Sequence, residues 1–331
     1  MLLGVCLEPS LALDYSQAHA CLTRLGYPDT CFDTLLRQSM NSQASVGRER
    51  TPHRMLEQQW IMEIWDPSTE SDPSVVKKSA LNLPMDLLDG SREDIYAFTH
   101  ALMYVSDRNI RPRRLPRQRA IILAEAEAAL ARCLDEQDYD LGGEVLLAWP
   151  LTGKSFSPAA TFGFRVLAGV EDVVGFLPSP ATRMQRLNNL HGDERASYLL
   201  ASTYHTAYVM GLLSAALLQA ERLPPQNIPI HAVRRDAASP ILKLLDADGR
   251  NTHWRDELYR LSDREQDALA GLFLAIALRR KTREREFAIV RELLVIGSAL
   301  GLTNTPIASQ AAEMLQRLAT FATYGSDEIA P

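Results

Sequence analysis

A histidine and a glutamate lie one helical turn apart within the stretch Arg48–Trp65, and side chains of these two types can share a proton or a metal ion. His53 and Glu57 are four residues apart, so both would lie on the same face of a helix. Arg50 and Arg54 flank the pair, and their charges would tune its proton affinity. One interpretation is an acid–base or metal-binding pair. The simpler one is an ordinary surface pair worth about 0.2–0.5 kcal/mol, because the spacing is not diagnostic in the way that HExxH is for zinc.

Two later histidines are candidates for the same site. His205 lies in an apolar, helix-forming stretch, where a histidine without a hydrogen-bond partner would cost about 1–3 kcal/mol. It is the best single candidate for an interior site, and a hydrogen-bonded core histidine is the simpler alternative. His100 precedes Tyr104 by four residues, so the two rings can contact each other or a shared ligand. Glu144 can face the same interior, although an exposed glutamate is the simpler interpretation.

Six arginines and two prolines occur within the twelve residues Arg108–Arg119. Guanidinium groups form paired hydrogen bonds with carboxylates and phosphates. Arg111, Arg113 and Arg114 are therefore candidates for binding an anion or an acidic peptide partner. The simpler interpretation is a solvated linker, because no aromatic residues alternate with the arginines as they do in platforms for single-stranded nucleic acid.

The composition narrows the class of protein. The chain has 35 basic and 41 acidic residues, a formal charge of −6, and so has no positive field that would attract nucleic acid or an anionic membrane. With 46% hydrophobic and 23% charged residues it can bury a substantial core. Its four cysteines form no C-x-x-C pair and are expected to be reduced core residues. These observations favour a globular cytoplasmic protein without a nucleic-acid partner.

One stretch, Ala196–Ala220, is long enough to cross a bilayer. Serine, threonine, histidine and glutamine residues lie on several of its faces, which argues against a membrane span. We expect instead a central helix that is buried by protein on most sides. The N-terminus lacks the basic region and the uninterrupted apolar run of a signal peptide, so no membrane partner is predicted.

Helix signals recur along the chain, and no segment alternates convincingly between apolar and polar residues as a strand does. A threonine or serine followed by proline, typical of a helix start, occurs at Thr51, Ser157 and Thr305, and Ser262 with Glu265 forms a capping-box pattern. The prediction is an all-α chain: an irregular α/α helical domain of about 11–12 helices, either solenoid-like or closed into an α/α toroid. The expected helices cover approximately residues 10–25, 29–40, 52–65, 74–81, 91–105, 116–134, 139–149, 158–172, 193–223, 263–279, 283–300 and 306–323.

Three parts are expected along the chain. Residues 1–223 form an N-terminal helical body. Residues 224–255 carry four prolines and no helical periodicity, and are predicted to be an irregular connection that serves as a boundary, lid or substrate loop. Residues 256–331 are predicted to be C-terminal helices that pack on the same body.

Four stretches carry a resemblance to a known family: ALDYSQAHACLTRLGYPD, RERTPHRMLEQQW, DIYAFTHALMYVSD and YDLGGEVLLAWPL. They resemble an uncharacterised family of helical proteins from actinomycetes, over the first half to two-thirds of the chain. Members are similar to one another in a Pro-His-Arg and a Thr-His motif, matched here by Pro52-His53-Arg54 and Thr99-His100. The resemblance implies a bacterial cytoplasmic protein, an accessory in secondary-metabolite or modified-peptide biosynthesis. It implies neither a reaction nor a cofactor.

Two hypotheses follow. In the first, the chain is a binding or accessory protein that holds a peptide, carrier or partner enzyme, and Arg50 and Arg54, with the later arginines, bind acidic groups. In the second, it is a biosynthetic enzyme in which His53, His100 and His205 converge with Glu57 or Glu144 as general acid–base groups or as a metal site.

Overall fold

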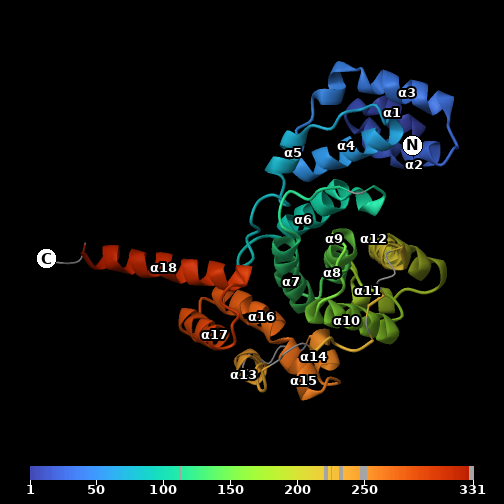
Figure 1. The fold of residues 1–331 in the computed structure, drawn as a ribbon. Helices are drawn as coiled ribbons and strands as arrows, with labels where there is room; N and C mark the ends of the chain where they lie inside the picture. The colour runs from blue at the N-terminus through green and yellow to red at the C-terminus, as the bar shows by residue number, and fades with distance from the viewer. Residues whose placement is uncertain (112, 220–222, 225, 231–233, 247–251, 328–331) are drawn as a thin grey trace. The chain divides into compact units, whose positions relative to one another are not determined.

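The computed structural model describes residues 1–331 except 112, 220–222, 225, 231–233, 247–251 and 328–331. Every regular element among the described residues is a helix: eighteen α-helices, labelled α1 to α18 in Figure 1, and three short 3-10 helices. This confirms the predicted all-α class. The α-helices outnumber the predicted 11–12 for two reasons. The expected helices at 139–149 and 263–279 are each divided in two, and four short helices were not expected: α1 (Leu2–Leu7), α11 (Met184–Asn188), α13 (Ser239–Asp246) and α14 (His253–Leu258). The expected helix at 139–149, for example, is divided at Leu147 into α8 (Tyr139–Leu146) and α9 (Ala148–Thr152).

Contacts between residues divide the chain into two compact units. The first contains Met1–Pro84 and Ala97–Arg117, and the second contains Met85–Tyr96 and Gln118–Pro331. The helix α6 (Arg92–Val105) begins in the second unit and ends in the first. The division therefore falls inside the predicted body of residues 1–223. Residues 224–255 are not irregular throughout, because α13 (Ser239–Asp246) lies within them.

The first unit is a set of short helices in which α2 packs against α1, α3 and α4. The helix α1 also packs against α3. Trp60, Ile61 and Phe98 are buried in this unit. Its complete helices are α1 (Leu2–Leu7), α2 (Ala12–Arg24), α3 (Thr30–Met40), α4 (Pro52–Trp65) and α5 (Pro73–Lys78).

The start of α4 agrees with the Thr-Pro signal. Pro52 is its first residue and Thr51 has extended backbone angles, as expected of a residue that precedes a helix. Thr51 makes no capping hydrogen bond with its side chain. Its hydroxyl lies 3.1 Å from Nδ1 of His53 instead. The Thr-Pro signal thus marks the helix start, and the threonine hydroxyl forms a hydrogen bond with His53 in place of a cap.

The second unit is built around α7 (Arg119–Asp135), which packs against α8, α10 and α16 (Figure 1). Its core contains Leu130 of α7, Phe162 of α10 and Phe273 of α16, all fully buried. The remaining helices of this unit are α10 (Pro158–Val174), α11 (Met184–Asn188), α12 (Gly192–Gln219), α14 (His253–Leu258), α15 (Asp263–Ala268), α16 (Ala270–Arg283), α17 (Phe287–Ala299) and α18 (Pro306–Asp327).

The long helix α12 differs from the expectation of burial on most sides. Only four of its residues are buried: Thr206, Val209, Leu213 and Leu217. They follow a single face at helical spacing, and this face packs on α8. Leu200 and Tyr204 on the opposite side are exposed. Within the part of the chain that the structure describes, no helix is long and apolar enough to cross a membrane.

Candidate functional site

The predicted His53 lies in the first turn of α4, half-buried and beside His100 of α6. The centroids of the two imidazole rings are 6.2 Å apart with an edge-to-face tilt. The ring of Tyr104 follows, 6.1 Å from that of His100, so the predicted meeting of these two residues is confirmed. Three ring side chains from two helices therefore form a continuous row in the first unit.

Glu57 joins this row through Tyr104. The tyrosine hydroxyl donates a hydrogen bond of 2.7 Å to Oε1 of Glu57, and Arg54 donates one of 2.7 Å to Oε2. The carboxylate is therefore held by a tyrosine and an arginine, on the face of α4 that also carries His53. A neutral imidazole and an anchored carboxylate in one row are suited to accepting protons or to hydrogen-bonding a ligand.

The pKa of His53 is lowered to about 4. Burial is the largest cause, followed by the charges of Arg54 and His100, while the charge of Glu57 acts in the opposite direction. Burial and positive neighbours both disfavour the imidazolium form. At neutral pH His53 is therefore uncharged and has a ring nitrogen that can accept a hydrogen bond.

The substitution His53→Gln is expected to change how stability depends on pH. Between pH 6.5 and about 4 the unfolded chain binds more protons at this position than the folded one, so stability falls as the pH falls through this window. With allowance for solvent screening of a half-buried ring, about 1–2 kcal/mol of that loss should disappear in the variant. Urea unfolding at neutral and at mildly acidic pH measures it. The exposed His191→Gln is the control, and an equal loss in wild type and His53→Gln would contradict the prediction.

Arg50 and Arg54, the two arginines beside His53, have structural partners. Arg50 donates a hydrogen bond to the backbone carbonyl of Ser10, and its guanidinium lies 3.6 Å from the carboxylate of Asp14. Arg54 pairs with Glu57 along one helix. Arg50 thus fixes the α2 region against the segment that leads into α4, and Arg54 positions the glutamate of the ring row.

The arginines of Arg108–Arg119 do not form a solvated linker throughout. Arg111 and Arg113 turn inward to the carboxylate of Glu63, and Arg111 also pairs with the buried Asp107. Asp107 in turn accepts a hydrogen bond of 2.8 Å from the indole of Trp60. These ion pairs bring the positive charges to a defined place on the first unit.

That place is a pocket of about 590 Å³ in the first unit. Its walls include the aromatic rings of Trp60 and Tyr104, which lie 5.6 Å apart. Arg113 and Arg114 are exposed members of its lining. The complete lining is Leu56, Gln59, Trp60, Glu63, Ser71, Val76, Tyr104, Val105, Arg111, Arg113, Arg114 and Pro116. The lining has three arginines and one glutamate, and with the adjacent Asp107 counted one positive charge remains in excess next to an apolar wall.

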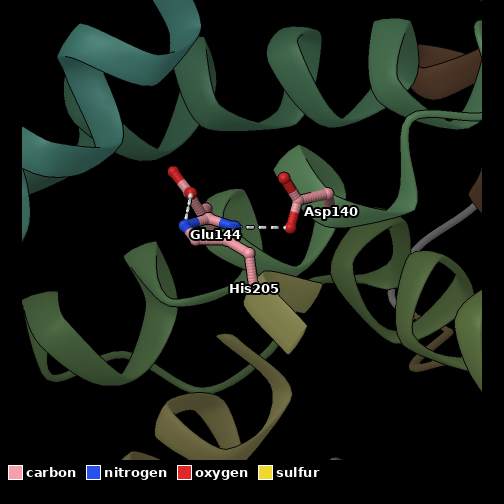
Figure 2. Close-up of side chains that lie close together, drawn as sticks. All are labelled: Asp140, Glu144 and His205. Atoms are coloured by element: carbon pink, nitrogen blue, oxygen red, sulfur yellow. Dashed lines mark hydrogen bonds and ion pairs between the residues drawn. The ribbon is translucent and has the colours of Figure 1, made fainter. Parts of the chain in front are cut away.

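The third predicted histidine, His205, belongs to a different cluster in the second unit (Figure 2). Its Nδ1 lies 2.8 Å from Oδ1 of Asp140, and its Nε2 lies 3.9 Å from Oε1 of Glu144. The imidazole thus lies between two carboxylates that project from successive turns of α8. The structure therefore groups His53 with His100 in one unit, and His205 with Asp140 and Glu144 in the other.

A glycine in α8 allows this arrangement. Gly143 faces α12, where a Cβ atom would lie 3.0 Å from Cγ1 of Val209 and 3.3 Å from the sulfur of Met210. The missing side chain lets α12 approach closely enough for His205 to reach Asp140. Every residue of α8 is buried, so the expectation that Glu144 is exposed is wrong.

Hydrogen bonds and nearby charges favour the charged forms of Asp140 and His205. Arg92 donates hydrogen bonds to Asp138, the N-cap of α8, and to Asp140. Burial acts to raise the pKa of Asp140. The hydrogen bond from His205 and the positive charges of His205 and Arg92 outweigh burial, so the pKa of Asp140 is lowered. The hydrogen bond to Asp140 is also the largest cause that raises the pKa of His205, and the charge of Glu144 adds to it.

Sequence reasoning missed Asp140, Asp138 and Arg92. One signal was present: Asp140 and Glu144 are four apart, so two carboxylates had to share one face of the predicted helix. Arg92 carried no such signal, because its pairing depends on a contact between segments about 46 residues apart.

A comparison with protein families matches residues 1–215 to a domain of unknown function, DUF6895. The match covers more than half of the chain. The chain belongs to this family. The matched region contains the row of rings in the first unit, the pocket, and the cluster of His205, Asp140 and Glu144. It ends before α13. No curated protein and no solved structure matches the chain.

Proposed function

We propose that this protein is a cytoplasmic accessory protein that binds an acidic segment of a peptide, carrier or partner enzyme. The observation that carries the proposal is the pocket of the first unit, which combines an aromatic wall with exposed arginines. Apolar walls supply affinity for a ligand's apolar side chains, and guanidinium groups orient its acidic groups through paired hydrogen bonds. A segment with an aromatic or aliphatic residue next to a carboxylate or phosphate would match both features.

The pocket is suited to binding because two of its three arginines are already oriented. Glu63 holds Arg111 and Arg113 from one side, which reduces the entropy that these long side chains would lose on binding. Arg114 lines the same pocket, and no acidic partner is found for it among the described residues. Arg114 is therefore the residue expected to meet the acidic group of the ligand.

The resemblance of four stretches of the chain to a family of helical proteins from actinomycetes supports a wider role. We propose a place in secondary-metabolite or modified-peptide biosynthesis, in which the chain holds a substrate peptide, a carrier or an enzyme for others to act on. A formal charge of −6 supports a peptide or protein partner in preference to a nucleic acid.

Charge reversal on the pocket tests the proposal. Partners encoded by neighbouring genes are captured with the full-length chain, and an array of peptides from those partners then identifies the bound segment. Arg114→Glu is expected to weaken this binding at least tenfold, because it places a negative charge beside the ligand's acidic group. The matched control is Arg119→Glu, another exposed arginine, which lies outside the pocket lining. Equal binding by wild type and both variants would contradict the proposal.

A second candidate function is favoured by one specific observation, the position of His205 between two carboxylates. We propose as the alternative a biosynthetic enzyme in which this histidine acts as the general acid. Asp140 would orient the ring, and the partly exposed imidazole would reach a substrate.

A further inference from the structure

We propose that Glu144 and His205 of the second unit are the ligands of a divalent transition-metal ion such as Zn²⁺, and that Asp140 supports the histidine from behind. One ligand atom from each of the three residues lies within 4.8 Å of the others. Imidazole nitrogen with carboxylate oxygen is a donor set that zinc and related ions prefer. The inference deepens the second candidate function, since it concerns the same cluster, and it is independent of the pocket in the first unit.

The distance between the two facing atoms fits a shared ion. Nε2 of His205 and Oε1 of Glu144 are 3.9 Å apart, which is too long for a hydrogen bond. Two atoms that are each about 2.1 Å from one zinc ion are separated by at most about 4.2 Å, and by about 3.4 Å in a tetrahedral site. A small rotation of the Glu144 side chain would therefore bring both atoms to bonding distance of one ion.

Asp140 is placed to support the histidine and not to bind the ion directly. Its Oδ1 faces Nδ1 of His205 at 2.8 Å and also accepts a hydrogen bond from the hydroxyl of Thr206. Its Oδ2 accepts a hydrogen bond from Arg92. The carboxylate thus fixes the ring so that Nδ1 keeps its proton and Nε2 points toward Glu144 (Figure 2). A carboxylate behind a histidine ligand has this role in many zinc sites.

The two ligands differ in exposure to solvent: the carboxylate is buried and the imidazole is partly exposed. The Glu144 side chain is 1% exposed and that of His205 is 38% exposed. A buried carboxylate gains most from an ion, because little water competes with it, while the exposed ring leaves the ion a path to solvent. With two protein ligands, the ion would keep open coordination positions for water or for an oxygen of a substrate.

Zinc titration of the full-length chain tests the inference. The background carries serine in place of the three accessible cysteines, Cys6, Cys21 and Cys31, because thiolates would compete for zinc. Calorimetry should find one Zn²⁺ per chain, in preference to Mg²⁺. In ¹⁵N spectra of the histidines, Nε2 of His205 should shift on zinc addition while Nδ1 keeps its proton. No binding, or a shift confined to other histidines, would overturn the inference.

Variants separate direct ligands from the supporting residue. Glu144→Gln and His205→Gln should each weaken zinc binding at least 100-fold, and Asp140→Asn should weaken it about 10–100-fold. The exposed His191→Gln should leave binding unchanged. Zinc binding that survives both ligand variants would overturn the inference. If either variant unfolds, the ¹⁵N spectra of the chain with Glu144 and His205 intact show whether His205 binds zinc. A chain that binds no zinc would leave the acid–base role of His205 standing, because that role needs no ion.

Discussion

Phe273→Ala is expected to lower the free energy of unfolding by about 3–5 kcal/mol, the usual cost of a large cavity in a core. Phe273 of α16 is fully buried. Its ring stacks on Trp254 of α14 with centroids 5.7 Å apart, and it meets Phe162 of α10 edge-on at 6.4 Å. Thermal or urea unfolding measures the loss. The size of the effect follows from the number of aromatic contacts that alanine cannot replace.

The same substitution at Phe321 is the matched control. Phe321 on α18 is 75% exposed, so Phe321→Ala should change stability by less than about 0.5 kcal/mol.

Hydrogen exchange adds a test of domain organisation. Because α10 and α16 share one core, Phe273→Ala should speed exchange in α10 as well as in α16. Faster exchange confined to the C-terminal helices would contradict the prediction that residues 256–331 pack on the same body.

The second large effect is expected from an ion pair between α7 and α16. Both oxygens of Asp135 accept hydrogen bonds from the guanidinium of Arg280, and the Arg280 side chain is 2% exposed. Asp135→Ala would leave the buried charge without this carboxylate. We expect a loss of about 3–5 kcal/mol in the free energy of unfolding, measured by urea denaturation.

A double variant distinguishes two causes of the lost stability: a buried charge that has lost its partner carboxylate, and lost packing. Asp135→Leu combined with Arg280→Met removes both charges and fills similar space, so it should recover most of the stability lost in Asp135→Ala. The control is Arg283→Met, whose pairing with Glu136 is largely exposed and should contribute less than about 1 kcal/mol. A double variant as unstable as the single one would show that the charge is not the cause.

Local signals in the sequence predicted the helices well because these signals act over a few residues. The three Thr-Pro and Ser-Pro starts coincide with the first residues of α4, α10 and α18. The capping box of Ser262 and Glu265 is present, with both reciprocal hydrogen bonds. Such features depend only on neighbouring backbone groups, so no knowledge of the tertiary structure is needed to find them.

The candidate sites were predicted only in part because burial is decided by distant segments. The contact between His100 and Tyr104 follows from spacing within one helix and was predicted. The burial of Glu144 was not, because α8 is enclosed by other helices and so has no exposed face. The exposed face of α12 was missed for the opposite reason. Its apolar residues imply burial, yet the fully buried residues of α12 follow one face only.

The chain leaves the second unit after Tyr96 and returns to it at Gln118, which has a consequence for synthesis on the ribosome. Gln310 of α18 donates a hydrogen bond to the backbone carbonyl of Met85, and its side-chain oxygen accepts one from the backbone of Leu87. These contacts join segments more than 200 residues apart in the chain. The first unit is fully translated at Arg117, whereas the second can close only after α18 has emerged. A truncated chain that begins at residue 118 would lack Arg92, and with it the guanidinium that holds Asp138 and Asp140.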